Sequence, residues 1–427
     1  MPSLNRRSFC QATGSAMLLL GGSAAEATLT APSLDSRICG LLSGSALGDA
    51  LGGPIEFQEA EAIQKLPDPP RRWQAGERLN GPARTATAAR LRFRDYAPLR
   101  VAPESYGQWN TRSTAGTVTD DTRHKLVLLQ ALRTAETGNR WPLRVPDLAR
   151  AYLDWHRQPA VARHGEYTVL CADWLEEWNL AARWILGERD PARARPPECL
   201  WQGLPTCCGQ MTSLPLAALY PGRPEAAYRA AWHLGFFDNG WGRDLNAAIV
   251  AGLSEALVVP VDPGHPATAW QRIFNTLRTT DPLGYRRIRW TQRAVDRWLD
   301  YALRTADQAD RCPAQMFQQW DREFQQNAKW EAQIPWVVMV GCLHVADYDP
   351  LAALQLTQEW GWDTDSYSQL LGAFLGALYG PELFPSDWLR KVSAGLLSDF
   401  GVALDQECAL LVRLATLSRT RPLVAAD

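Results

Sequence analysis

The chain is organised around the stretch Gly361-Trp362-Asp363-Thr364-Asp365-Ser366, in which two carboxylates flank a hydroxyl just before a helix. Apolar residues between positions 367 and 378 recur at helical spacing, which indicates a buried helix. Gly372 and Gly376 lie four residues apart on another side of it, where a second backbone can approach closely. Gly380-Pro381 ends the helix, because a C-cap glycine is followed by a residue that cannot continue it.

The two aspartates of this stretch allow two interpretations. On a regular helix Asp363 and Asp365 would point to different sides. In the turn that leads into a helix, however, they can converge on one ion. Acidic residues at a helix N-terminus are also favoured by the helix dipole, so plain capping explains the pattern equally well.

A second acidic stretch, Thr119-Asp120-Asp121-Thr122, precedes a helix whose apolar face includes Leu126, Leu129 and Leu132. Thr119 is a natural N-cap residue. Adjacent aspartates at a helix N-terminus can splay to either side of a pair of ions. Hard divalent ions such as Mg²⁺ or Mn²⁺ prefer such carboxylate and hydroxyl oxygens. Capping alone remains an alternative here too.

A third stretch lies near the beginning of the chain, where positions 38–51 indicate a helix. Gly40, Gly44 and Gly48 repeat at every fourth position, which is costly inside a helix and predicts a close contact with a second helix. The sequence then breaks at Gly53-Pro54. Glu56 follows in the turn, where a carboxylate can serve as an acid, a base or a metal ligand. An exposed loop glutamate is the alternative.

The ordered set of Gly48-Asp49-Ala50-Leu51-Gly52 with Glu56 and the two acidic stretches resembles the ADP-ribosylglycohydrolase family, from about Arg37 to Gly380. The resemblance implies a single all-α domain with two Mg²⁺ or Mn²⁺ ions in a central cleft. Glu56 matches the mobile glutamate that the family uses in catalysis. The implied metal ligands are Thr119, Asp120, Asp121, Asp363, Asp365 and Ser366, with serine where the family usually has threonine.

The chain departs from the family pattern at positions that help to hold the substrate. Trp362 replaces a usual glycine, as in a branch of the family with Gly-Trp-Asp-Thr-Asp and little-known substrates. The usual Asn and Arg are missing from Cys208-Gly209-Gln210-Met211, and the usual Thr-His from Phe237-Asp238-Asn239. We therefore expect poor activity on ADP-ribosyl-arginine. The candidate substrate-binding residues are Trp362, Gly209, Met211 and Asp238.

The N-terminus predicts export. Arg6-Arg7 precede an apolar run at 16–20, and Ala25-Glu26-Ala27 forms a cleavage site. We expect a twin-arginine signal peptide over 1–27, an ADP-ribosylglycohydrolase-like domain over 28–427, and a periplasmic or secreted location. The run is too short to span a bilayer, so no stable membrane insertion is expected after signal removal. A disordered tail is the alternative.

Composition narrows the partners and the architecture. The net charge of -2 gives no reason to expect a nucleic-acid partner. The nine cysteines show no C-x-x-C spacing, which leaves disulfides and free thiols both open. No linker interrupts the helical patterns, so we expect one domain and a monomer. Positions 58–118 are interpreted as a long, partly helical excursion near the mouth of the site. Further helices are expected at 214–219, 224–234, 245–258, 267–277, 288–304 and 334–345.

The leading hypothesis is a dimetal-dependent hydrolase that cleaves an N- or O-glycosidic bond of an ADP-ribose-like or other ribosyl compound. Its substrate would be a small molecule or an ADP-ribosylated one. The rival hypothesis is a non-catalytic ADP-ribose- or sugar-binding protein that keeps the fold, which a displaced Glu56 would favour. A structural protein with a decayed site is the third, and the oxygen side chains kept at all the ligand positions argue against it.

Overall fold

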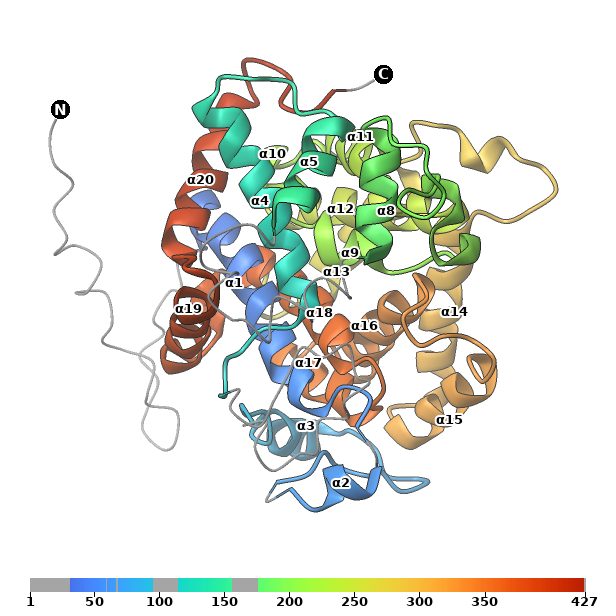
Figure 1. Ribbon diagram of the computed structural model, residues 1–427. Helices are drawn as coiled ribbons and strands as arrows, with labels where there is room; N and C mark the ends of the chain where they lie inside the picture. The colour runs from blue at the N-terminus through green and yellow to red at the C-terminus, as the bar shows by residue number, and fades with distance from the viewer. Residues whose placement is uncertain (1–30, 59, 67, 95–113, 156–175, 426–427) are drawn as a thin grey trace, which may run out of the picture. The chain divides into compact units, whose positions relative to one another are not determined.

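Two helices packed along each other form the centre of the computed structural model: α1 (Leu34–Gly52) and α18 (Thr364–Tyr379) (Figure 1). The structure describes residues 31–58, 60–66, 68–94, 114–155 and 176–425. Within it, Pro32–Asp427 forms one compact unit. Both helices are buried along nearly their whole length.

Glycines on both helices allow this close contact. A Cβ atom at Gly44 would clash with the carbonyl oxygen of Gly372, and one at Gly376 would clash with that of Gly40. Because the obstructing atoms are backbone, no side-chain rotation would relieve the clash. The glycine repeats noted separately in the two sequence stretches therefore face each other, and the expected close approach of two helices is confirmed.

Local capping fixes where the two central helices begin and end. The Ser33 hydroxyl accepts a hydrogen bond from the Ser36 amide at 3.1 Å and caps α1. At the same end of the pair, where α18 stops, Gly380 has φ +76°, a backbone conformation that suits glycine, and Pro381 follows it. The predicted end of this helix is confirmed.

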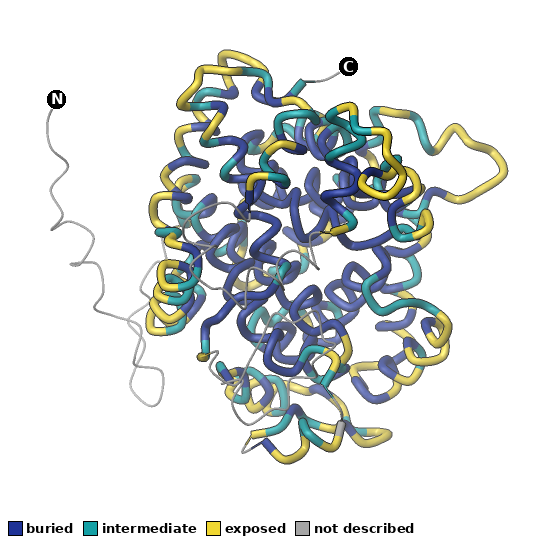
Figure 2. Tube along the Cα trace, viewed as in Figure 1, coloured by how far each residue is buried: buried dark blue, intermediate teal, exposed yellow. Residues whose placement is uncertain are grey.

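The other helices surround this pair, and the burial map shows the central segments dark (Figure 2). In the described chain, α1 and α18 contact α4 and α9. They also contact α12, α16, α17, α19 and α20. The remaining α-helices are α2 (Ala60–Gln64), α3 (Gly81–Ala88), α4 (Asp120–Thr137), α5 (Val145–Trp155), α8 (Glu176–Ile185), α9 (Cys208–Thr212), α10 (Leu216–Leu219), α11 (Pro224–Leu234), α12 (Gly240–Ala256), α13 (Pro266–Thr279), α14 (Ala294–Ala309), α15 (Pro313–Glu323), α16 (Gln333–Val345), α17 (Pro350–Glu359), α19 (Ser386–Phe400) and α20 (Leu404–Leu417). Short 3₁₀ segments are η1 (Gly53–Ile55), η2 (Pro197–Gly203), η3 (Tyr285–Arg287) and η4 (Pro381–Leu383).

The all-α fold class is confirmed. The described residues contain no strand, only the isolated bridge pairs Leu143–Val424 and Thr206–Glu331. α1 together with η1 is long and apolar enough to cross a membrane by composition, but 94% of the tested window is buried, as in a core helix. Every cysteine in the described chain is a free thiol.

Several predicted helix boundaries are wrong, two of them by five residues or more at the start of the helix. The helix expected at 288–304 begins only at Ala294, because residues 286–292 are all solvent-exposed and contribute nothing to the core. The helix expected at 245–258 begins earlier, at Gly240. Of the 58–118 excursion, α2 and α3 are helical, and 95–113 lies outside the described residues.

Candidate metal and catalytic site

Three helix-flanking turns bring carboxylates together beside the N-terminus of α18. Oxygen atoms of Glu56, Asp363 and Asp365 lie within 4.8 Å of one another. Oxygen atoms of Asp120, Asp121 and Asp365 do so as well. Asp365 belongs to both groups, so the two groups meet at one side chain.

The N-terminus of α4 is held in place by Asp49, a buried residue of α1. The Thr119 amide donates to Asp49 Oδ1 at 2.7 Å, and the Thr122 amide donates to Asp49 Oδ2 at 2.9 Å. The Thr119 hydroxyl accepts from the Asp121 amide at 3.2 Å. Asp49 thus caps a helix to which it does not belong, and it fixes the position of Asp120 and Asp121.

Asp49 was not among the site residues predicted from the sequence. The available signal was an acidic residue on α1, a helix that is otherwise apolar and rich in glycine. A buried carboxylate needs hydrogen-bond partners. For Asp49 these partners are the Thr119 and Thr122 amides, which have no partner within α4 itself.

The N-terminus of α18 is tied to the end of α1 in a similar way. The Thr364 hydroxyl donates to the carbonyl oxygen of Gly52 at 2.8 Å. The Phe57 amide donates to the carbonyl oxygen of Trp362 at 2.8 Å. These bonds join the turn that carries Glu56 to the turn that carries Asp363.

Several buried oxygens of this site have no hydrogen-bond partner in the described part of the chain. They are Asp121 Oδ1, Asp363 Oδ2 and both carboxylate oxygens of Asp365. The nearby Thr119 hydroxyl lowers the pKa of Asp365 and so favours its charged form. It is not aligned as a hydrogen-bond donor to either carboxylate oxygen of Asp365. A buried carboxylate without a partner is costly, so the orphaned oxygens indicate a site built for cations.

The electrostatics point the same way. Burial, and then the surrounding carboxylates, raises the pKa of Glu56 well above its ordinary value. The same two causes raise the pKa values of Asp121, Asp363 and Asp365. Divalent ions would relieve this repulsion, and an all-oxygen donor set suits Mg²⁺ or Mn²⁺. The residues present therefore fit such ions.

Ser366 lies beside Asp121, where its hydroxyl could also bind an ion. Its hydroxyl donates to Asp121 Oδ2 at 3.1 Å, so it links the start of α18 to the start of α4. Lys125 is buried one turn along α4, and its Nζ donates to the backbone oxygen of Asp121 at 2.7 Å. This lysine partly balances the negative charge from behind the site.

A narrow cavity lies next to the carboxylates, and aromatic side chains line part of it. The ring centroids of Trp201 and Trp330 are 5.4 Å apart, as are those of Trp178 and Trp201. No local sequence pattern singled out these three tryptophans, because they come from separate segments. The lining residues are Glu56, Phe57, Asp120, Asp121, Trp178, Trp201, Thr206, Cys207, Cys208, Met211, Trp330, Asp363 and Ser366.

Trp362, next to Asp363 in the chain, is 47% exposed, so it is not packed into the core. Its backbone is left-handed, with φ +69°. Lys329 Nζ lies 5.1 Å from the centroid of its ring. Its neighbour in space, Phe57, lines the cavity.

The other three candidate substrate-binding residues are placed differently. Met211 lines the cavity. Gly209 and Asp238 are buried and bonded to each other: the Gly209 amide donates to Asp238 Oδ1 at 2.8 Å, as does Asn246 Nδ2. Burial raises the pKa of Asp238 to about 7. These contacts hold the start of α9, so the direct role of Gly209 and Asp238 in substrate binding stays a prediction.

His124 is a packed residue of α4. Its Nδ1 lies 3.0 Å from the Tyr152 hydroxyl, and its ring lies 4.2 Å from that of Trp178. Burial lowers its pKa well below the ordinary value, so the ring is neutral.

Comparison with known proteins adds one finding. The model of the ADP-ribosylglycohydrolase family matches residues 30–421, nearly the whole chain. A search of curated proteins gave no match.

Proposed function

The chain belongs to the ADP-ribosylglycohydrolase family, and from that premise we propose that it is a metal-dependent hydrolase that cleaves an N- or O-glycosidic bond. The family suggests activity on ADP-ribose-like compounds. We propose that the substrate is such a compound or another riboside. We also propose that the mature protein acts in the periplasm or outside the cell.

One observation carries this proposal: two groups of carboxylates share Asp365, and both oxygens of Asp365 lack a hydrogen-bond partner in the described chain. Two divalent ions, Mg²⁺ or Mn²⁺, would be held here. When bound, such ions orient oxygen atoms of the substrate and lower the pKa of a water. Their ligands would be Thr119, Asp120, Asp121, Asp363, Asp365 and Ser366.

Glu56 would move the proton. It is half-buried and lines the cavity, so its carboxyl group can give a proton to the leaving group. After the bond breaks, the same carboxylate can accept a proton from water. Its place within 4.8 Å of Asp363 and Asp365 supports the hydrolase over the non-catalytic binding protein, for which a displaced Glu56 was expected.

Substrate choice would depend on the aromatic surfaces. Trp201 and Trp330 line the same cavity as the carboxylates, and Trp362, next to Asp363 in the chain, is partly exposed. Aromatic faces stack on sugars and bases with little demand for specific hydrogen bonds. We therefore propose weak activity on ADP-ribosyl-arginine and stronger activity on a smaller or differently linked glycoside.

The test is kcat/KM for ADP-ribosyl-arginine and a panel of ribosides, with Mg²⁺ or Mn²⁺ added. Glu56→Gln should lower kcat by about 10²- to 10⁴-fold, and because glutamine keeps a carbonyl oxygen and the proposed ligands are intact, metal content should stay unchanged. Trp362→Gly should change the ratios between substrates, whereas Trp290→Gly, an exposed tryptophan that does not line the cavity, should not. A panel on which wild type and Glu56→Gln perform alike would overturn the proposal.

A further inference from the structure

The loop between α13 and α14 has an unusual surface for this protein. Residues 281–292 read Asp-Pro-Leu-Gly-Tyr-Arg-Arg-Ile-Arg-Trp-Thr-Gln, and we call them the basic–aromatic loop. Trp290 is 92% exposed, Ile288 50% and Leu283 43%. The loop extends away from the neighbouring helices in Figure 1 and is coloured mostly exposed in Figure 2. Nothing in the proposed hydrolase mechanism uses it.

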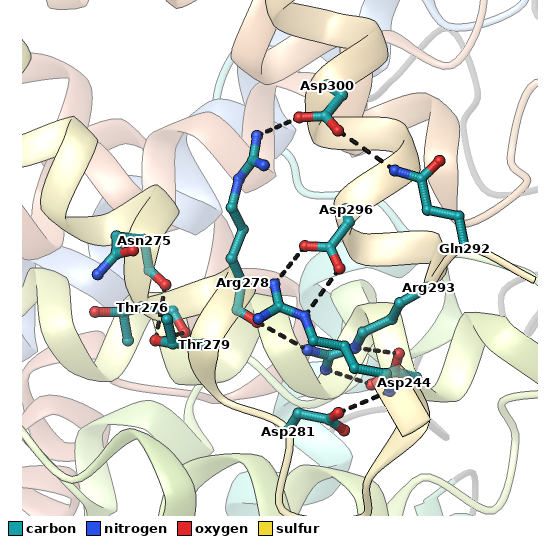
Figure 3. A network of polar contacts seen from close by, with 11 residues as sticks. Asp244, Asn275, Thr276, Arg278, Thr279, Asp281, Gln292, Arg293, Asp296 and Asp300 are labelled. Carbon is teal, nitrogen blue, oxygen red and sulfur yellow. Dashed lines mark hydrogen bonds and ion pairs between the residues drawn. The ribbon is translucent and has the colours of Figure 1, made fainter. Parts of the chain in front are cut away.

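The base of the loop is firmly anchored, as Figure 3 shows. Arg293 is buried and makes a two-bond ion pair with Asp244, with Nε–Oδ2 2.8 Å and Nη2–Oδ1 2.6 Å. The Tyr228 hydroxyl donates to the same carboxylate at 2.6 Å. Arg293 Nη1 also donates to the carbonyl oxygen of Arg278 at 3.2 Å.

The turn within the loop is braced as well. Asp281 accepts from the amides of Tyr285 and Arg286, at 2.8 and 2.9 Å. Arg286 pairs with Asp296 through two bonds of 3.0 and 2.6 Å. The tip is thus preorganised, and a surface held in one shape loses little entropy when it docks.

The tip of the loop, around Ile288, carries positive charge that these ion pairs do not neutralise. Arg287 and Arg289 are exposed and flank Ile288, and the described residues offer neither of them an ion-pair partner. The two acidic groups nearest in the loop and on α14, Asp281 and Asp296, are already engaged. A positive, apolar tip therefore stands on a protein whose formal net charge is -2.

We propose that the basic–aromatic loop docks reversibly on an anionic lipid bilayer surface. Tryptophan favours the headgroup level of a membrane, where its ring is buried and its N–H stays wet. Guanidinium groups bind lipid phosphates. Three apolar side chains on a convex tip are too few for a specific protein interface. The contact would be peripheral, which agrees with the expectation of no stable insertion.

The experiment is flotation of the mature protein with vesicles of phosphatidylcholine alone or of phosphatidylcholine and phosphatidylglycerol in equal parts. We expect binding only to the anionic vesicles, and weaker binding at high salt. Arg287→Gln with Arg289→Gln should weaken binding about thirtyfold. Trp290→Ser should weaken it without changing the salt dependence.

Matched controls lie on other surfaces. Arg322→Gln with Arg419→Gln removes two exposed arginines from elsewhere, and Leu397→Ser removes an exposed apolar side chain of α19. Both should bind like wild type. Equal binding by wild type and the loop variants would overturn the proposal. So would a wild-type dimer, seen by sedimentation, that the loop variants lose, because the tip would then bind a second copy.

Discussion

At the scale of single residues, Asp49 connects the glycine-rich helix to the acidic helix start. Its two carboxylate oxygens satisfy two amides at the N-terminus of α4, and the side chain is fully buried. The carboxylates of Asp120 and Asp121 therefore depend on a residue that is itself no proposed ligand. The bonds that Asp49 makes to the α4 amides do not use the carboxylates of Asp120 and Asp121, which leaves those two carboxylates available for the proposed ions.

Replacing Asp49 with alanine should expose this dependence. The change removes a cap and leaves two buried amides without partners, so the free energy of unfolding should fall by about 3 kcal/mol. Ser33→Ala removes the ordinary cap of α1 and should cost only about 1 kcal/mol. Urea denaturation of both variants checks this. Equal losses would contradict the assigned role of Asp49.

Asp238 should make stability depend on pH. Burial raises its native pKa to about 7, against about 4 in an unfolded chain. Between these values the native state keeps a proton that the unfolded state has lost, so stability falls as pH rises and levels off above about 7. Over this pH range the free energy of unfolding should fall by about 4 kcal/mol.

Asp238→Asn cannot ionise and should lack this contribution. The difference in unfolding free energy between wild type and variant should therefore shift against wild type from about pH 4 to about pH 7. Denaturation at a series of pH values measures it. Parallel curves for the two proteins would show that Asp238 titrates normally.

At the scale of elements, the contact between α1 and α18 determines the site. The glycines that let the backbones touch lie on the same helices as the motifs, so the contact sets the distance from Glu56 to Asp363 and Asp365. Thr364, at the start of α18, bonds directly to Gly52, at the end of α1. Packing and chemistry are therefore coupled.

Gly44→Ala tests this coupling. Its Cβ would clash with the backbone oxygen of Gly372, so the helices must separate. The free energy of unfolding should fall by about 3 kcal/mol, and metal affinity should fall with it. Gly81→Ala in α3 is the matched control, because nothing lies within 4 Å of its Cβ position. A Gly44→Ala protein as stable as the control would contradict the account.

Much of the helical framework could be predicted from sequence, because glycine repeats, caps and apolar spacing are local signals. The boundaries at Gly380 and at 224–234 follow from such signals. The false helical start at 288 arose because helical spacing continued through an exposed loop. The aromatic wall of Trp178, Trp201 and Trp330 could not be predicted, since its members meet only in three dimensions.

At the scale of the whole molecule, location remains a prediction. The sequence Arg6-Arg7 lies outside the described residues. Changing both arginines to lysine keeps the charge but breaks the twin-arginine pair, so the precursor should remain in the cytoplasm. Cell fractionation followed by immunoblotting measures this. Normal export of the double variant would remove the periplasmic assignment.

The starts of α4 and α18 and the turn that carries Glu56 are proposed to build one cation site around Asp365. Metal content should be measured by Mn²⁺ titration and elemental analysis on wild type, Asp365→Ala and Asp405→Ala. Asp405 also lies in the first turn of a helix, α20, but is exposed and does not belong to the acidic groups. We predict about two ions in wild type and in Asp405→Ala, and loss of both in Asp365→Ala. Unchanged metal content in Asp365→Ala would contradict the account and leave these carboxylates as helix caps.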